Sequence, residues 1–244
     1  MGGIMPEGSS STPQNDRSVP LTVDVYFDLI CPWCLIGQKR LDAALAERPG
    51  VIVTRIWHPF QLNPGMPRGG MNRQAYLQTK FGGADRAAAV YGMIAQTAER
   101  DGLNLHLDAI GRTPSTLDGH RLVRQVAQAH PKLTDPLIDR LFDAYFRRGR
   151  DIGQAAVLRE EAVAVGVPEP FVATLLASHE GVEAIRHADA FARRTGIQAV
   201  PFFILNRRFA IAGAQEAHAI LPLIDAATTA YLADEVPEVR FGLA

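Results

Sequence analysis

The sequence has little of several features that would assign a function directly. Its 244 residues include only two cysteines, aromatic residues make up 7%, and the formal net charge is -1. A balanced charge gives no general attraction to nucleic acid or to an anionic membrane. No apolar run approaches the roughly 20 residues that a membrane-spanning helix needs. We therefore expect no nucleic-acid partner and no membrane association.

Residues 1–20 lack the pattern of a secretory signal, which is a basic segment followed by an apolar one. Glycine, serine, proline and polar residues dominate this stretch, so we expect a flexible N-terminal tail. We accordingly expect a cytoplasmic protein. In that reducing compartment, a close pair of cysteines is more often catalytic or metal-binding than a structural bridge.

Both cysteines lie in one short stretch, DLICPWCLIG, with two residues between them. A structural zinc site would need four ligands. The sequence has no second Cys-x-x-Cys pair, and its seven histidines show no pairing at a zinc-binding spacing. We therefore expect a redox pair and no metal.

Hydrophobic patterns place the cysteines between a strand and a helix. Residues 21–30 and 51–57 are predicted strands, rich in β-branched and aromatic side chains, and the segment between them has helical periodicity. The length of this unit suits a right-handed crossover with the two strands parallel. From about residue 63 the patterns are helical, with no convincing strand for the next hundred or so residues.

Strand character returns only near the end of the chain. An amphipathic helix at 182–194 comes first, and residues 200–205 and 209–212 then form a predicted hairpin with Asn206-Arg207 as its tight turn. A last helix is expected at about 216–232.

This order of elements predicts an α/β class with a thioredoxin-like fold and an inserted all-helical domain. The thioredoxin-like domain would be discontinuous. We expect it to comprise residues 21–64 and 183–236, with the helical insertion at 65–182.

A strand-to-helix junction suits a reactive thiol. Thiolate is the attacking form, and an ordinary cysteine has a pKa of about 8.5. The start of a helix favours negative charge at Cys31, and Pro32 fits the first helical position, where a missing N–H costs nothing. Cys34, one turn further on, can attack a mixed disulfide on Cys31. We predict that Cys31 is the nucleophile and Cys34 the resolving thiol, with Trp33 at the surface shaping access.

Two further side chains could tune the pair. Asp28 precedes Cys31 by three residues. It is either a buried proton acceptor for Cys34, or a solvent-facing or strand-end aspartate that makes a helix-cap bond. His58 follows the second predicted strand; a structural role is the more common one for a lone histidine, and tuning of the site is the alternative.

The Val200-Pro201 step opens the predicted hairpin. An X-Pro bond is cis in only about 5–6% of cases in folded proteins, so the residues alone leave the isomer open. We expect the Val200 backbone to face a substrate peptide.

Several longer segments are shared with one known family. CPWC after the first strand is followed by WHPFQLNPGMP, YLQTKFG, RTPSTLDGHRL and FRRGRDI, in this order, and then by AVPFFILNRRFAIAGAQ near the end. With them the chain resembles the DsbA family of thiol-disulfide oxidoreductases, and more narrowly its FrnE-like branch, which has a link to polyketide biosynthesis. The resemblance implies Cys31 and Cys34 as the redox pair and Pro201 as a cis-proline facing it. Pro32, Trp33 and Val200 would then contact substrate.

The resemblance also covers a polar segment of the insertion, comprising Arg112, Thr113, Asp118 and His120. We favour helix capping and surface solvation for these residues, and contact with substrate is the alternative.

The expected function is a dithiol-disulfide oxidoreductase or isomerase. Its substrates would be protein or peptide disulfides, or a small-molecule thiol of polyketide-like type. We expect no tightly bound cofactor, with glutathione or thioredoxin as candidate redox partners. The oligomeric state stays open, and a homodimer is one option.

Two other functions stay open. The same fold includes glutathione-dependent 2-hydroxychromene-2-carboxylate isomerases and kappa-class glutathione transferases, which usually carry serine at the position of the first cysteine. The other alternative is a non-catalytic binding or chaperone module that docks through the insertion.

Overall fold

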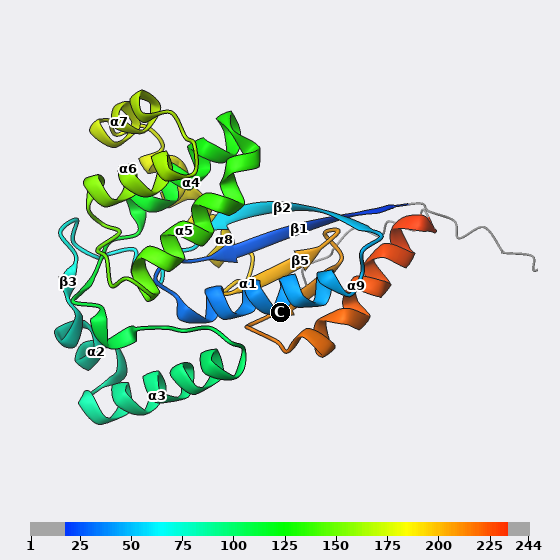
Figure 1. Ribbon diagram of the computed structural model, residues 1–244, viewed down its shortest axis with the longest axis horizontal. Helices are drawn as coiled ribbons and strands as arrows, with labels where there is room; N and C mark the ends of the chain where they lie inside the picture. Colours follow the sequence, from blue (N-terminus) through cyan, green and yellow to red (C-terminus); the bar gives the residue numbers. More distant parts are fainter. Residues whose placement is uncertain (1–17, 234–244) are drawn as a thin grey trace, which may run out of the picture.

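The computed structural model describes residues 18–233, which fold around a four-stranded sheet (Figure 1). The strand order is β2-β1-β5-β6, with β1 parallel to β2 and the other neighbours antiparallel. β1 is therefore a central strand, and its apolar residues from Leu21 to Phe27 are buried. The strands are β1 (Val19–Phe27), β2 (Val51–Pro59), β5 (Phe202–Leu205) and β6 (Phe209–Ala212).

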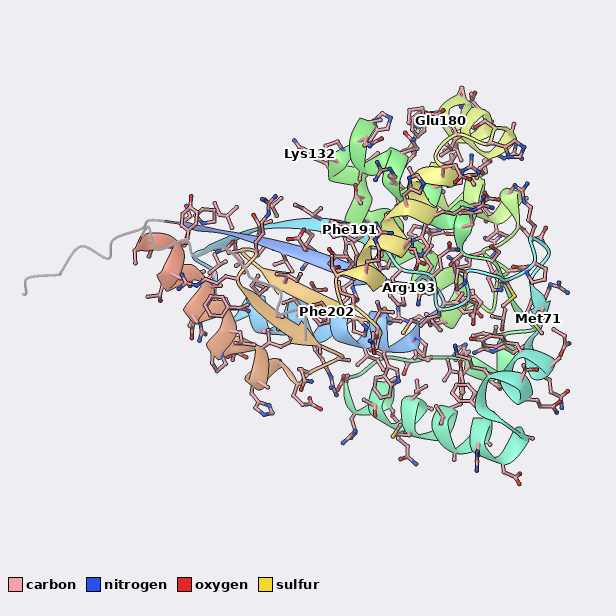
Figure 2. The ribbon with its side chains drawn as sticks, turned by 180° about the vertical axis from the view of Figure 1, so that it is seen from behind. Met71, Lys132, Glu180, Phe191, Arg193 and Phe202 are labelled. Carbon is pink, nitrogen blue, oxygen red and sulfur yellow. The ribbon has the colours of Figure 1, made fainter. Side chains whose placement is uncertain are left out.

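Helices cover both faces of this sheet. α1 (Pro32–Ala46) and α9 (Ala217–Leu232) contact each other on one face, and α8 (Val182–Arg194) contacts β2 on the other. Figure 2 shows this second face, with Phe191 and Arg193 on α8 in front of the sheet. The predicted α/β class and thioredoxin-like arrangement are confirmed.

The segment between β2 and α8 forms helices in two groups at one end of the sheet (Figure 1). α2 and α3 lie on one side of the start of α1, and α4 to α7 lie on the other. The helices are α2 (Arg73–Phe81), α3 (Ala84–Arg100), α4 (Leu117–Ala129), α5 (Thr134–Phe146), α6 (Ala155–Ala164) and α7 (Glu169–Ala177), with short 3-10 turns at Leu107–Ala109 and Pro131–Leu133.

The insertion also contains a small ladder, so the expectation that it holds no strand is wrong. β3 (Met71–Asn72) pairs antiparallel with β4 (Arg112–Thr113). Strands of two residues are too short to show the alternation that identifies a strand in a sequence. The ladder ties the start of α2 to the segment that leads into α4.

One hydrophobic core runs through the sheet and the insertion. Phe27 of β1, for example, packs edge-on against Phe142 of α5, with ring centroids 6.3 Å apart. The division into a thioredoxin-like domain and an insertion at the stated boundaries stays a prediction. Within the described residues, no helix is long and apolar enough to cross a membrane.

Element ends differ from expectation mainly beside the cysteines. β1 starts at Val19, inside the predicted tail, and residues 1–17 of that tail lie outside the described residues. β1 also ends at Phe27, because the next residues form a turn into α1, and β2 continues through His58 to Pro59. The predicted hairpin turn is confirmed: Asn206 and Arg207 have φ of 48° and 56°.

Candidate active site

Cys31 and Cys34 lie where β1 turns into α1. Cys31 is the N-cap residue and Pro32 the first residue of the helix. The Cys31 amide donates to the Asp28 carbonyl and the Cys34 amide donates to the Cys31 carbonyl, both at 3.0 Å. Both thiols are free and buried. The structure therefore describes the reduced pair, held at a helix start as predicted.

The two thiols have different electrostatic environments. Burial raises the pKa of the Cys34 thiol well above its usual value, and the hydrogen bond to Cys31 and the charge of Cys31 raise it further. The Asp28 amide donates to Cys34 Sγ at 3.5 Å and opposes this shift. Cys34 therefore stays protonated at neutral pH and can donate to the Cys31 sulfur.

The Val200–Pro201 loop lies against this pair. The Val200–Pro201 peptide bond is cis, as the resemblance implied, and the Cys31 thiol donates to the Val200 carbonyl at 3.6 Å. Gly37 of α1 allows the close approach, since a Cβ there would lie 2.8 Å from Pro201 Cγ. The Val200 backbone is thus next to the predicted nucleophile. Its contact with substrate stays a prediction.

Asp28 is completely buried, so its interpretation as a solvent-facing carboxylate is wrong. Its Oδ2 accepts from the Leu62 amide at 2.7 Å, and its Oδ1 lies 3.2 Å from His120 Nε2. The Asp28 backbone amide donates to the Cys34 sulfur, and the charge of the Asp28 carboxylate raises the pKa of Cys34. A role as proton acceptor stays a prediction.

His120 comes from α4 and brings the insertion into the site. It is buried, and its ring packs edge-on against Phe27 with centroids 5.1 Å apart. The preceding Gly119 makes this possible, because a Cβ there would lie 2.6 Å from Leu29 Cδ1. Thr113 is buried as well. Surface solvation is therefore the wrong interpretation for Thr113 and His120, whereas Arg112 is exposed and Asp118 forms an ion pair with Arg121 at 2.6 Å.

His58 and Trp33 differ in their relation to the cysteines. His58 Nε2 lies 2.7 Å from Asp24 Oδ1, and its ring stacks on Tyr26 with centroids 4.5 Å apart. A tuning role for His58 has no support from these contacts. Trp33 is half-buried and packs on the hydrophobic core between the two cysteines. Its predicted role in access stays open to test.

The sequence gives no signal for two further groups of the structure. One is the backbone amide of Leu62, which bonds to Asp28, and the other is Arg73, buried at the start of α2. A backbone donor has no sequence signal, and a single arginine in a polar stretch has none either. Among residues 18–233, no group of three or more His, Cys, Asp or Glu side chains could hold a metal ion.

Comparisons with known proteins find relatives of similar sequence and fold. The uncharacterized protein YwbO of Bacillus subtilis (strain 168) is 25% identical over 193 residues, which cover 75% of this chain and 86% of that protein. The crystal structure of a probable DsbA oxidoreductase from Streptomyces coelicolor has a TM-score of 0.76 and 27% identity, and covers 89% of this chain and 92% of that chain.

Two more distant structures share the fold. The cytosolic disulfide reductase DsbM from Pseudomonas aeruginosa, solved with GSH, has a TM-score of 0.56 and 23% identity over 87% of this chain and 98% of that one. A 2-hydroxychromene-2-carboxylate isomerase has a TM-score of 0.56 and 16% identity, over 88% of this chain and 100% of its own.

A family model provides the assignment. The model of the DSBA-like thioredoxin domain matches residues 22–225. This range contains both cysteines, the helical insertion and Pro201. The match therefore spans the sheet, the site and the insertion together, and the chain belongs to the DSBA-like thioredoxin domain family.

Proposed function

We propose that this protein is a dithiol-disulfide oxidoreductase that works through Cys31 and Cys34. The observation that carries the proposal is the asymmetry of the pair. Cys31 is the N-cap residue of α1, and its thiol donates to the Val200 carbonyl. Cys34 is a buried thiol whose raised pKa keeps it protonated. Membership of the DSBA-like family and the similarity to a probable DsbA oxidoreductase support this chemistry.

The reductive reaction would proceed in two exchanges. The Cys31 thiolate attacks one sulfur of the substrate disulfide, the substrate S–S bond breaks, and the leaving sulfur takes the electron pair and then a proton. Cys34 next gives up its proton and attacks the Cys31 sulfur of the mixed disulfide. The second substrate thiol is released and a Cys31–Cys34 disulfide forms, so two electrons pass from the protein to the substrate. The reverse sequence oxidises a substrate dithiol.

The substrates proposed are protein, peptide or small-molecule disulfides in the cytoplasm. Glutathione or thioredoxin would return the Cys31–Cys34 disulfide to the dithiol. The similarity in fold to a disulfide reductase solved with GSH supports glutathione as one such partner. The net direction depends on the reduction potential, which spans about 150 mV between thioredoxin and DsbA.

The roles of the two cysteines can be tested with Cys31→Ser and Cys34→Ser variants. Both should lose insulin reduction and the reactivation of scrambled ribonuclease. Only Cys34→Ser should accumulate a mixed disulfide with substrate, because it keeps the nucleophile and lacks the resolving thiol. Full activity in both variants would overturn the proposal.

The same pair of variants separates the alternative functions. A glutathione-dependent isomerase or transferase would keep its activity in Cys34→Ser and lose it in Cys31→Ser. One structure of similar fold is a 2-hydroxychromene-2-carboxylate isomerase. A binding or chaperone module would function normally with serine at position 31. The presence of both thiols favours dithiol chemistry.

A further inference from the structure

Arg73, the first residue of α2, is a buried cation with only neutral partners. Its side chain donates from Nη1 to Thr113 Oγ1 at 3.0 Å and to the Tyr145 hydroxyl at 3.3 Å. Its Nη2 donates to the Tyr91 hydroxyl at 2.7 Å. Only 6% of the residue is exposed, and its Nε is buried with no hydrogen-bond partner in the part of the chain that the structure describes.

Other buried arginines of this protein have a carboxylate partner. Arg40 pairs with Asp101 at 2.6 Å, and the fully buried Arg121 pairs with Asp118 at 2.6 Å. Among residues 18–233, Arg73 makes no ion pair. A buried charge is costly unless it is paired, so an anion bound against the Arg73 guanidinium would stabilise it.

A series of contacts leads from the Arg73 guanidinium to the redox turn. It lies 5.8 Å from the centre of the Tyr76 ring, and the Tyr76 hydroxyl accepts from Asn63 Nδ2 at 3.0 Å. The residue before Asn63 donates its amide to Asp28, at the turn that carries Cys31. Burial raises the pKa of Tyr91, Arg73 lowers it, and the charge of Cys31 adds to the increase. The Tyr91 hydroxyl is therefore within electrostatic reach of the Cys31 sulfur.

A cavity adjoins this cluster. It has a volume of about 430 Å³, lies between α2 and α3, and is lined by Arg73 and Tyr91 among other residues. The exposed Asp108 is the one carboxylate in its lining. Figure 2 shows Met71, two residues before Arg73, at this insertion end of the molecule. The size of the cavity suits a small molecule, and the burial of Arg73 keeps it from the side chains of a folded protein substrate.

We propose that Arg73 and the hydroxyl of Tyr91 form a subsite for the carboxylate of a small acidic disulfide or thiol. The inference rests on the proposed dithiol chemistry and names a class of substrate for it. The carboxylate would pair with the Arg73 guanidinium and accept a hydrogen bond from Tyr91, whose hydroxyl proton is free to donate because its oxygen accepts from Nη2. The charge of Asp108 would oppose this binding.

The test is a series of small disulfides that differ in end-group charge. Dithiodipropionate is a dianion, hydroxyethyl disulfide is neutral, and cystamine is a dication. Their second-order rate constants with the reduced protein are measured by stopped flow, together with the rate of insulin reduction. We expect the dianion to react fastest. Arg73→Gln should slow the dianion by about ten- to a hundredfold, as expected for loss of a charge-assisted hydrogen bond, with smaller changes for the other two and for insulin.

Three further variants make the test independent of any folding defect in Arg73→Gln. Arg73→Lys keeps the charge and should restore most of the preference for the dianion. Tyr91→Phe keeps the ring and should lower the preference, and Asp108→Asn should increase it. Arg159→Gln, an exposed arginine on α6, is the matched control and should leave the order of rates unchanged.

The possible outcomes separate the two proposals. If all three small disulfides react equally fast with the natural protein, the subsite is disproved and the dithiol chemistry stands. If insulin reduction falls as much as dianion reduction in Arg73→Gln and Tyr91→Phe, the cluster supports the fold and does not select substrate. If no disulfide reacts with the natural protein, the proposed function itself fails.

Discussion

Asp28 and His120 form a buried pair that joins the helical insertion to the redox turn. The two residues are 92 positions apart, and Asp28 Oδ1 lies 3.2 Å from His120 Nε2. Both side chains are almost completely covered, at 0% and 1% exposure. A second Asp–His pair joins β1 to β2: Asp24 lies 2.7 Å from His58, and there the histidine side chain is 30% exposed. The chain thus contains an internal control for the pair beside the cysteines.

We predict that Asp28→Asn slows the second exchange, in which Cys34 resolves the mixed disulfide. The pKa of Cys34 is raised, so this thiol needs a proton acceptor at neutral pH, and the charge of the buried Asp28 carboxylate acts on it. General-base catalysis contributes about 10²- to 10⁴-fold, so resolution should slow by a factor in this range, while the first attack by Cys31 changes little. Rapid quenching followed by mass spectrometry measures the lifetime of the mixed disulfide.

The matched control for this prediction is Asp24→Asn, which changes the Asp24–His58 pair between β1 and β2 and should leave the lifetime unchanged. The charge of Asp28 also raises the pKa of Cys34, so its removal would ease ionisation of that thiol. A shorter lifetime of the mixed disulfide in Asp28→Asn would show that this electrostatic effect dominates, and the proton-acceptor hypothesis would then be wrong.

We predict that His120→Ala destabilises the protein more than His58→Ala. His120→Ala leaves a buried carboxylate oxygen without its partner, which costs about 1–3 kcal/mol of unfolding free energy. The Asp24–His58 pair is partly exposed, so its loss should cost about 0–1 kcal/mol. Urea unfolding of the reduced proteins measures both values. Equal losses would show that the pair beside the cysteines has no special structural role.

Local patterns in the sequence predicted the elements around the site well. Proline after Cys31, the apolar strand before it and the amphipathic periodicity at 182–194 are short-range signals, and each corresponds to an element of the structure. The turn at Asn206-Arg207 is likewise encoded by the residues that adopt positive φ.

Contacts between distant segments could not be predicted in the same way. Nothing near His120 in the sequence indicates that Gly119 lets α4 approach Leu29 closely enough to reach Asp28. The cluster around Arg73 joins residues from α2, α3, β4 and α5, whose side chains meet only in the folded chain. Because such contacts leave no local pattern, the sequence predicts a surface position for the polar segment of the insertion, whereas Thr113 and His120 are buried.

We predict that Gly37→Ala lowers both stability and redox activity. A Cβ at this position would lie 2.8 Å from Pro201 Cγ and 3.3 Å from the Ala214 Cα, so α1 or the Pro201 loop must shift. Overpacking of this kind costs about 1–3 kcal/mol, which exceeds the gain of up to about 1 kcal/mol in helix propensity. Urea unfolding measures the loss of stability, and insulin reduction measures the activity.

Gly92→Ala is the control for this substitution. Gly92 lies within α3, and a Cβ there would meet no atom within 4 Å. This variant should gain about 0.5–1 kcal/mol of stability and keep its activity. If Gly37→Ala behaves like Gly92→Ala, the close approach between α1 and Pro201 is not needed for the site.

We predict that the reduced protein loses stability as pH rises above about 8.5, the usual pKa of a cysteine in an unfolded chain. The pKa of Cys34 is raised by burial, so the folded protein binds this proton more tightly than the unfolded chain does. The contribution of Cys34 to stability is therefore fully present below its unfolded pKa. The free energy of unfolding then falls by about 1.4 kcal/mol per pH unit between the unfolded and the folded pKa of Cys34. Burial raises the pKa of several tyrosines too, and their effect should begin only near pH 10. These are Tyr26, Tyr76, Tyr91 and Tyr145.

Cys34→Ala separates the cysteine from the tyrosines in this pH dependence. The variant lacks the buried thiol, so its unfolding free energy should stay nearly constant between about pH 8.5 and pH 10, where that of the natural protein falls. Urea unfolding under a reducing agent, repeated across this range, measures both curves. Parallel curves for the two proteins would show that Cys34 ionises equally easily in the folded and unfolded chains. In that case Cys34 would need no proton acceptor in the folded protein, and the role predicted for Asp28 would have no basis.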